Sequence, residues 1–103
     1  MEEVVTISAG MRKALSILTR ESRMDIAITL VVKELLHLRI NRAKGAIAKF
    51  EKKYEMTFAE FEKACDDGRI ENPYSYEVEE DDWNWELSIT ELEDLMEYKQ
   101  WLS

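Results

Sequence analysis

The residues that could do chemistry in this chain are few, and their spacing fits no common catalytic or metal site. The single histidine, His37, and the single cysteine, Cys65, lie far apart and cannot supply the ligands of a zinc site. The carboxylates do not follow the spacing of a calcium-binding loop, and the three glycines are scattered rather than gathered in a phosphate-binding loop. We therefore expect no metal, no cofactor and no catalytic residue, and predict that the protein is not an enzyme.

Two features imitate catalytic groups but have simpler interpretations. Cys65 precedes two aspartates, whose negative charge raises the pKa of a thiol and disfavours the reactive thiolate, so a packing role is expected. The run from Glu79 to Asp82 resembles the paired carboxylates of an acid/base site, but a run of like charges is more often a solvated surface.

Aromatic residues on both sides of this acidic run indicate protein binding instead. Tyr and Trp are frequent anchors of protein interfaces, and dense negative charge steers a surface toward a basic partner. A core role stays open for Trp85 and is weaker for Trp83, because two residues two positions apart cannot share one helical face. The predicted partner-binding residues are Tyr74, Tyr76, Glu79, Glu80, Asp81, Asp82, Trp83 and Trp85.

The net charge of −8 conceals a strong asymmetry along the chain. Residues 1–54 contain eleven Lys or Arg and six Asp or Glu, a net charge of +5, whereas residues 55–103 contain three and sixteen, a net charge of −13. We interpret the chain as a single domain with a basic dimerisation part, 1–54, and an acidic helical arm, 55–103. The two halves either attract each other or bind different partners, unless both are simply solvated faces.

Nothing in the sequence indicates a membrane or secreted protein. No apolar run approaches the roughly 20 residues of a transmembrane helix, and the N-terminus is acidic where a signal peptide is basic. A single cysteine cannot form an internal disulfide. We therefore expect a cytoplasmic protein that does not enter a membrane.

The stretch that must position the other elements is residues 22–54, which the pattern predicts to be one long helix. Its apolar residues fall at alternating spacings of four and three, as in a coiled coil. The main seam, which we predict to mediate dimerisation, consists of Leu36, Ile40, Ala43, Ile47, Phe50 and Tyr54. A second row consists of Met24, Ile28, Val31, Leu35 and Leu38. So wide an apolar surface needs a cover, which could be the C-terminal half of the chain, a second copy or another protein.

The C-terminal residues 83–102 are predicted to form a helix that matches this seam. A parallel homodimer along the seam would place Arg39 against Lys44, a like-charge pair that disfavours it. The C-terminal helix is acidic, and its apolar residues Trp85, Ile89, Leu92 and Met96 follow four-three-four spacing. We predict that it packs antiparallel on the long helix, either within the chain or swapped between two chains.

The other elements are short. Residues 4–8 alternate as in a β-strand, Ser8 is placed to cap a helix that runs to Arg20, and Ser22 is placed to cap the long helix. The predicted fold class is mainly α, with a long central helix, antiparallel helical packing, a short N-terminal strand and a dimeric assembly.

A sharp corner is expected after the long helix. Thr57 and Glu60 occupy the two positions of a capping box, which predicts a helix from residue 58 to about residue 67. Gly68 can supply the left-handed turn that ends this helix. Residues 69–82 contain the only proline and are expected to form an extended edge segment.

The layout resembles the antitoxins of small prokaryotic toxin–antitoxin pairs. The resemblance rests on residues 50–62, FEKKYEMTFAEFE, followed by the acidic helix that starts with Trp83, Asn84, Trp85 and Glu86. It implies a protein that covers the basic active site of a small toxin, with Tyr76, Trp83 and Trp85 inserted and the carboxylates imitating a polyanionic substrate.

The N-terminus has a second likeness, to ribbon-helix-helix proteins. Residues 5–8, a short helix and then residues 22–26 resemble the strand–helix–helix start of that family, in which paired strands enter the major groove of DNA. No Lys or Arg lies on the strand, which argues against phosphate contacts. The residues that such a DNA contact would use are Thr6, Ser8, Arg12, Lys13 and Arg23.

From the sequence we therefore expect an antitoxin-like protein that neutralises a small basic protein toxin by occlusion, and the DNA-binding likeness adds autoregulation of its operon as a further hypothesis. The alternative is a self-associating helical scaffold or adaptor without a toxin partner. A homo-oligomer is expected in both cases.

Overall fold

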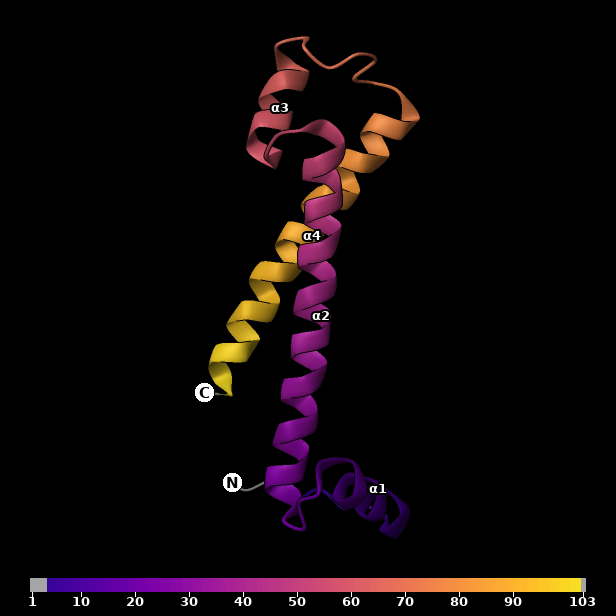
Figure 1. Ribbon diagram of the computed structural model, residues 1–103, viewed down its shortest axis with the longest axis vertical. Coiled ribbons are helices and arrows are strands. Elements are labelled where there is room, and N and C mark those ends of the chain that lie inside the picture. The colour runs from indigo at the N-terminus through magenta and orange to yellow at the C-terminus, as the bar shows by residue number, and fades with distance from the viewer. Residues whose placement is uncertain (1–3, 103) are drawn as a thin grey trace.

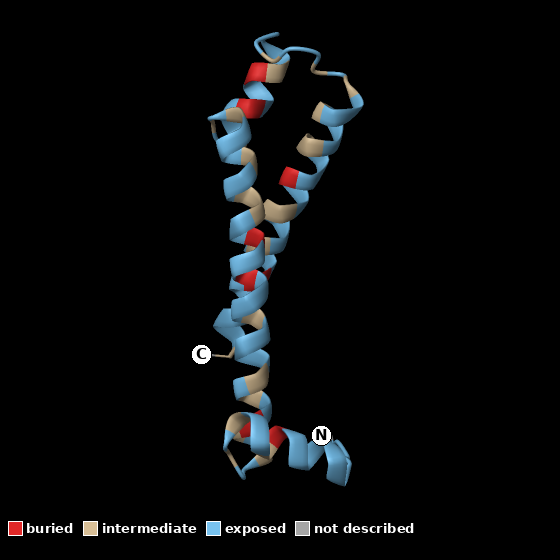
Figure 2. Cartoon of the chain, turned by 45° about the vertical axis from the view of Figure 1, so that its right-hand side comes forward, coloured by how far each residue is buried: buried red, intermediate tan, exposed pale blue. Residues whose placement is uncertain are grey.

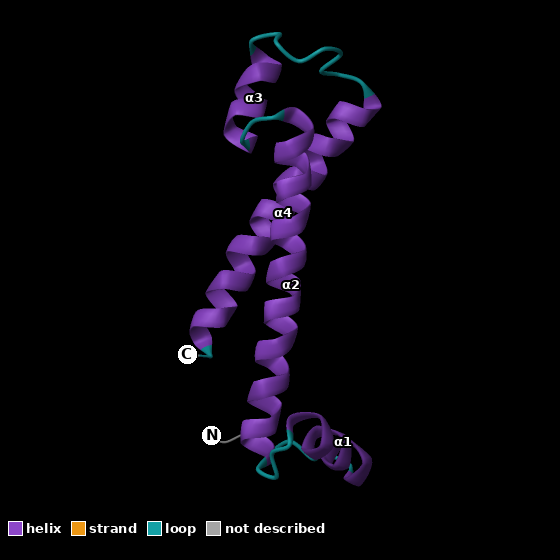
Figure 3. Cartoon of the chain, viewed as in Figure 1, coloured by secondary structure: helices purple, strands orange, loops and turns teal. Residues whose placement is uncertain are grey.

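The computed structural model describes residues 4–102, and within this range the chain is helical with connecting loops and no strand (Figure 3). The helices are α1 (Ala9–Thr19), α2 (Met24–Tyr54), α3 (Phe58–Asp66) and α4 (Tyr76–Trp101). They form an elongated molecule with extents of 59 × 30 × 22 Å. The prediction of a mainly α protein built on a long central helix is confirmed.

The long helix α2 is the axis of the molecule. The final helix α4 starts near the C-terminal end of α2 and runs back beside it in the opposite direction, while α1 packs across the N-terminal end of α2 (Figure 1). The short helix α3 lies at the corner and contacts α4. Antiparallel packing of the C-terminal helix on the long helix, within one chain, is therefore confirmed.

The core is thin because it consists of the seam between helices rather than a central cluster (Figure 2). The fully buried apolar residues within 4–102 are Leu15, Ala27, Ile40, Ala43, Phe61, Ala64, Trp85 and Leu95. On the α4 side the buried position is Leu95, whereas Met96, which the spacing had placed on the seam, is 40% exposed. Many other large apolar side chains stay exposed, which is unusual for a monomer that needs no cover.

The N-terminal strand was predicted wrongly. Residues 4–8 have no regular structure, because a strand needs a neighbouring strand for its backbone hydrogen bonds and the described residues provide none. Ser8 does cap α1, since its Oγ accepts a hydrogen bond from the Met11 N–H at 3.1 Å. The helix ends one residue before the predicted Arg20, which adopts a left-handed conformation with φ of 57°.

The cap predicted for the long helix is also wrong. The N-cap of α2 is Arg23 rather than Ser22, and no side chain caps the free N–H groups of its first turn. Asp25 lies in that first turn, where a carboxylate interacts favourably with the positive end of the helix dipole.

The corner after α2 forms as predicted. The Thr57 Oγ1 accepts a hydrogen bond from the Glu60 N–H, and the Glu60 carboxylate accepts one from the Thr57 N–H at 3.0 Å, which completes the capping box. At the other end of α3, Gly68 has φ of 74°, and the Arg69 N–H donates to the Ala64 carbonyl at 2.8 Å. This is a Schellman turn, which ends the helix and reverses the chain.

The extended segment predicted for residues 69–82 is wrong over its second half. The helix α4 begins at Tyr76, where the Ser75 Oγ caps it by accepting a hydrogen bond from the Val78 N–H. Glu77 and Glu79 lie in its first turn, where negative charge is favoured by the helix dipole. The acidic run therefore belongs to the helix instead of a flexible arm.

Replacing Thr57 by Ala is expected to lower the free energy of unfolding by about 1 kcal/mol, because the first turn of α3 loses one side of its capping box. The matched control is Ser22→Ala, which is expected to change it by less than about 0.5 kcal/mol because Ser22 caps no helix. Urea unfolding followed by far-UV circular dichroism measures both. Equal losses would show that the cap assignment is wrong.

Candidate functional site

An aromatic cluster packs the N-terminal half of α4 against α2 and α3. Trp85 is 0% exposed and lies at its centre, with its ring centroid 5.2 Å from Phe61, 5.3 Å from Phe58, 5.6 Å from Phe50 and 5.9 Å from Tyr54. Trp85 is therefore a core residue, and its predicted contact with a partner is wrong. Its indole Nε1 is buried without a hydrogen-bond partner.

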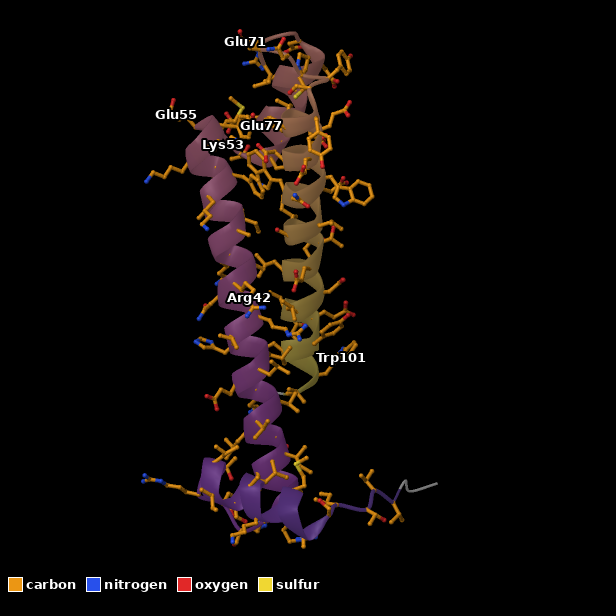
Figure 4. All side chains as sticks on the ribbon, turned by 90° about the vertical axis from the view of Figure 1, so that its right-hand side faces the viewer. Arg42, Lys53, Glu55, Glu71, Glu77 and Trp101 are labelled. Atoms are coloured by element: carbon orange, nitrogen blue, oxygen red, sulfur yellow. The ribbon has the colours of Figure 1, made fainter. Side chains whose placement is uncertain are left out.

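A polar group closes the edge of this cluster. The Lys53 Nζ lies 2.6 Å from Asp81 Oδ2 and 2.8 Å from Glu77 Oε1, and the Tyr54 hydroxyl donates a hydrogen bond to Asp81 at 2.5 Å. Figure 4 shows Lys53 and Glu77 side by side near the C-terminal end of α2. We call these four residues the polar latch, because they join α2 to the start of α4. Asp81 therefore serves an internal contact instead of the predicted partner contact.

The latch shifts the ionisation of its own members. Burial, followed by the hydrogen bond to Asp81, raises the pKa of Tyr54 to about 12. The carboxylates of Asp81 and Glu77 raise the pKa of Lys53, so its ammonium group stays charged.

Asp82 lies next to the latch residue Asp81 and near Glu62 and Cys65 of α3. Burial and then the charge of Glu86 raise its pKa, and its Oδ1 is buried without a hydrogen-bond partner. Burial, then Asp82 and Asp66, raise the pKa of the Cys65 thiol in the direction expected from the sequence. No group of three or more His, Cys, Asp or Glu side chains within residues 4–102 could hold a metal ion.

The remaining aromatic residues of the predicted site face away from the core. Tyr76 is 82% exposed and Trp83 is 66% exposed, and both lie on the side of α4 opposite Trp85. The same side carries further exposed residues along the whole helix at spacings of four and three. We define the outer stripe as Tyr76, Glu80, Trp83, Leu87, Asp94, Tyr98 and Trp101. Figure 4 shows Trp101 on the side of α4 away from α2.

The predicted partner-binding residues therefore separate into two groups. Tyr76, Glu80 and Trp83 come together on the outer stripe, with exposed Glu79 beside it and exposed Tyr74 in the loop before α4. The hydrogen bond with the Glu80 carboxylate raises the pKa of Tyr76. The inward-facing members of the predicted set are Asp81, Asp82 and Trp85.

Four residues of the outer stripe were missed by sequence reasoning. They are Leu87, Asp94, Tyr98 and Trp101. Their signal was the helical spacing that starts at Tyr76, and it becomes visible only when the helix begins at Tyr76 instead of Trp83. A groove of about 420 Å³ lies beside the stripe, lined from α2 by Arg39 and from α4 by Leu87, Thr90, Glu91, Asp94, Leu95 and Tyr98.

The residues predicted for dimerisation are already covered within one chain. Ile40 and Ala43 are buried, and Leu36, Ile47, Phe50 and Tyr54 are half-buried on the side of α2 that faces α4. A dimer through this seam would need α4 to leave it.

The residues named for DNA contact do not share one surface element. Thr6 lies in the irregular N-terminal segment, the Ser8 hydroxyl caps α1, and Arg23 is 3.5 Å from Asp25. Arg12 and Lys13 are exposed on α1. No helix within residues 4–102 is both long and apolar enough to span a bilayer.

Replacing Asp81 by Asn is expected to lower the free energy of unfolding by about 1–3 kcal/mol, because charge-assisted hydrogen bonds from Lys53 and Tyr54 are lost. The control Glu77→Gln removes an ion pair with a carboxylate that is 74% exposed, so a loss below about 1 kcal/mol is expected. Equal losses for the two variants would contradict a central role of Asp81.

The latch also makes stability fall at high pH. The pKa of Tyr54 is about 12 in the folded chain and 10.0 in the unfolded reference, so its contribution is complete below pH 10 and declines as the pH rises toward 12. Titration followed by tyrosinate absorbance should show one tyrosine of the wild type that ionises with a pKa of about 12. Tyr54→Phe should remove this ionisation, and Asp81→Asn should shift it to lower pH.

No protein-family model, no curated protein and no solved structure matches the chain. Any function must therefore be argued from the surfaces themselves.

Proposed function

We propose that the protein is a non-catalytic binding protein whose outer stripe on α4 covers a basic surface of a second protein. The observation that carries the proposal is the exposure of Trp83 and Tyr76 on a helix whose inner face is already packed. The contact of an exposed aromatic ring with water is unfavourable and does not stabilise the fold. At many interfaces, in contrast, Trp and Tyr contribute most of the binding free energy.

The charge of α4 supports a basic partner. The helix contains ten Asp or Glu and one lysine, Lys99. Glu77 and Asp81 are paired with Lys53, and Glu79, Glu80 and Asp94 are exposed on or beside the outer stripe. Such a surface attracts a cationic partner over a distance of about 10 Å and speeds its association.

We further propose that the partner is a small toxin of the kind that antitoxins neutralise, as the resemblance of residues 50–62 and 83–86 implies. The mechanism would differ from insertion of a flexible arm. A preformed helix lays its outward face on the toxin, while the aromatic cluster and the latch keep α4 ordered, so little conformational entropy is lost on binding. In this mechanism Trp83 and Tyr76 are the anchors, and Glu79 and Glu80 provide the charge.

The test is a growth-rescue and binding experiment with the protein encoded by the neighbouring reading frame of its native genome, which the proposal requires to be small and basic. Its expression alone should arrest growth, and co-expression of the wild-type chain should restore it. Trp83→Ala is expected to weaken the complex by roughly 30-fold, the effect of losing one interface hot spot. Binding should also weaken as salt is raised, because the partner is attracted by charge.

The matched control is Glu55→Gln, an exposed carboxylate at the corner outside the outer stripe, which should bind as the wild type does. Circular dichroism checks that Trp83→Ala keeps its helices. Full rescue and unchanged affinity with Trp83→Ala, or a neighbouring protein that is harmless and does not bind, would refute the proposal.

A further inference from the structure

The N-terminal half of α2 carries an apolar row that the described part of the chain covers only in part. Leu35 is 48% and Leu38 56% exposed, and Ile28 and Val32 are exposed beside them. Met24 and Val31 complete the row and are half-buried. A contiguous apolar patch of this kind marks an interaction surface in a monomeric unit.

This face is distinct from the two faces of α2 that are in use. At 100° per residue, the row of Ile28, Val31 and Leu35 lies about a third of a turn from the seam that α4 occupies. The face that α1 covers is marked by Ala27, which is 0% exposed. The row therefore lies between the two covered faces and is open to solvent.

We propose that a second copy of this chain docks on this row, so that two α2 helices pack antiparallel through their N-terminal halves. The row follows the four-three spacing of a coiled coil from Met24 to Leu38. Antiparallel pairing centred near residue 33 sets Ile28 against Leu38 of the second copy and Val31 against its Leu35. Each exposed side chain of the row then meets an apolar neighbour.

The charges beside the row favour a second copy as the partner and an antiparallel orientation of the two α2 helices. The row becomes basic after Leu38, where Arg39 and Arg42 follow on the same side of α2. A parallel pair would place Arg42 against Arg42 of the second copy and repel it. The antiparallel pair instead brings Arg39 beside Asp25 of the second copy at both ends of the interface. Asp25 is accessible, since its contact with Arg23 is 3.5 Å long and its side chain is 73% exposed.

The proposed dimer leaves the N-terminal part of the outer stripe free, because Arg39 borders the stripe at Leu87, Asp94 and Tyr98 but not at Tyr76, Glu80 or Trp83. The inference therefore does not rest on the proposed function. The proposed dimer would present two outer stripes, one on each copy.

Sedimentation velocity and light scattering over a wide range of protein concentration test the dimer. The wild type is expected to be a dimer, and Leu35→Glu is expected to weaken it by more than about 100-fold, because two carboxylates enter an apolar seam. The control Trp83→Glu places the same charge on the outer stripe, at a residue that is 66% exposed and outside the groove that Arg39 lines, and should leave the dimer intact. A monomeric wild type, or a dimer unchanged by Leu35→Glu, overturns the proposal.

Charge exchange tests the direction without disturbing the apolar row. Asp25→Arg and Arg39→Asp are each expected to weaken the dimer by roughly fivefold, and the double variant should restore it. Restoration supports the antiparallel pair, and additive weakening refutes it. Retention of partner binding by Leu35→Glu, together with its loss in Trp83→Ala, would show that the two surfaces act independently.

Discussion

The burial of Trp85 is the interaction on which the arrangement of this molecule depends. A large aromatic side chain removes about 150–250 Å² from water, worth roughly 4–6 kcal/mol, which exceeds the cost of about 1–3 kcal/mol for its unpaired indole N–H. The rings of Phe50 and Tyr54 from α2, and of Phe58 and Phe61 from α3, surround it. Since these elements meet at one side chain, the rotation of α4 about its axis is fixed there.

That rotation decides which residues of α4 can meet another protein. With Trp85 inward, Asp81 falls beside Lys53 and Tyr54, and the helix turns Tyr76, Trp83 and Leu87 outward. The acidic run is divided by the same geometry, because Asp81 completes the latch while Glu79 and Glu80 face solvent. A stretch that reads as one acidic cluster in the sequence therefore serves two purposes, one in the fold and one on the surface.

Local signals in the sequence predicted only part of the local structure, since the strand at residues 4–8 and the cap at Ser22 were wrong. The capping box at Thr57 and the turn at Gly68 each depend on a few neighbouring residues, and the seam on α2 follows a regular spacing. The sequence therefore predicted all three features correctly. The start of α4 was misplaced because Pro73 and the acidic run obscured Ser75, a single capping residue. Spacing placed Trp85 on the apolar stripe that packs on α2, but it left a partner contact open as well, because only the folded chain brings the rings of α2 and α3 around this side chain.

The charge asymmetry along the chain has a structural meaning that composition alone did not define. The basic and acidic halves do meet inside the molecule, where Lys53 pairs with Glu77 and Asp81 in the first turns of α4. Farther along, α2 and α4 lie side by side through apolar residues such as Ile40 and Leu95, which are insensitive to charge. The ion pairs of Lys53 lie at one end of this seam, where they help to set the register of α4. The apolar seam holds the helices together. The exposed carboxylates of α4 face the solvent, where they would attract the basic partner that we propose.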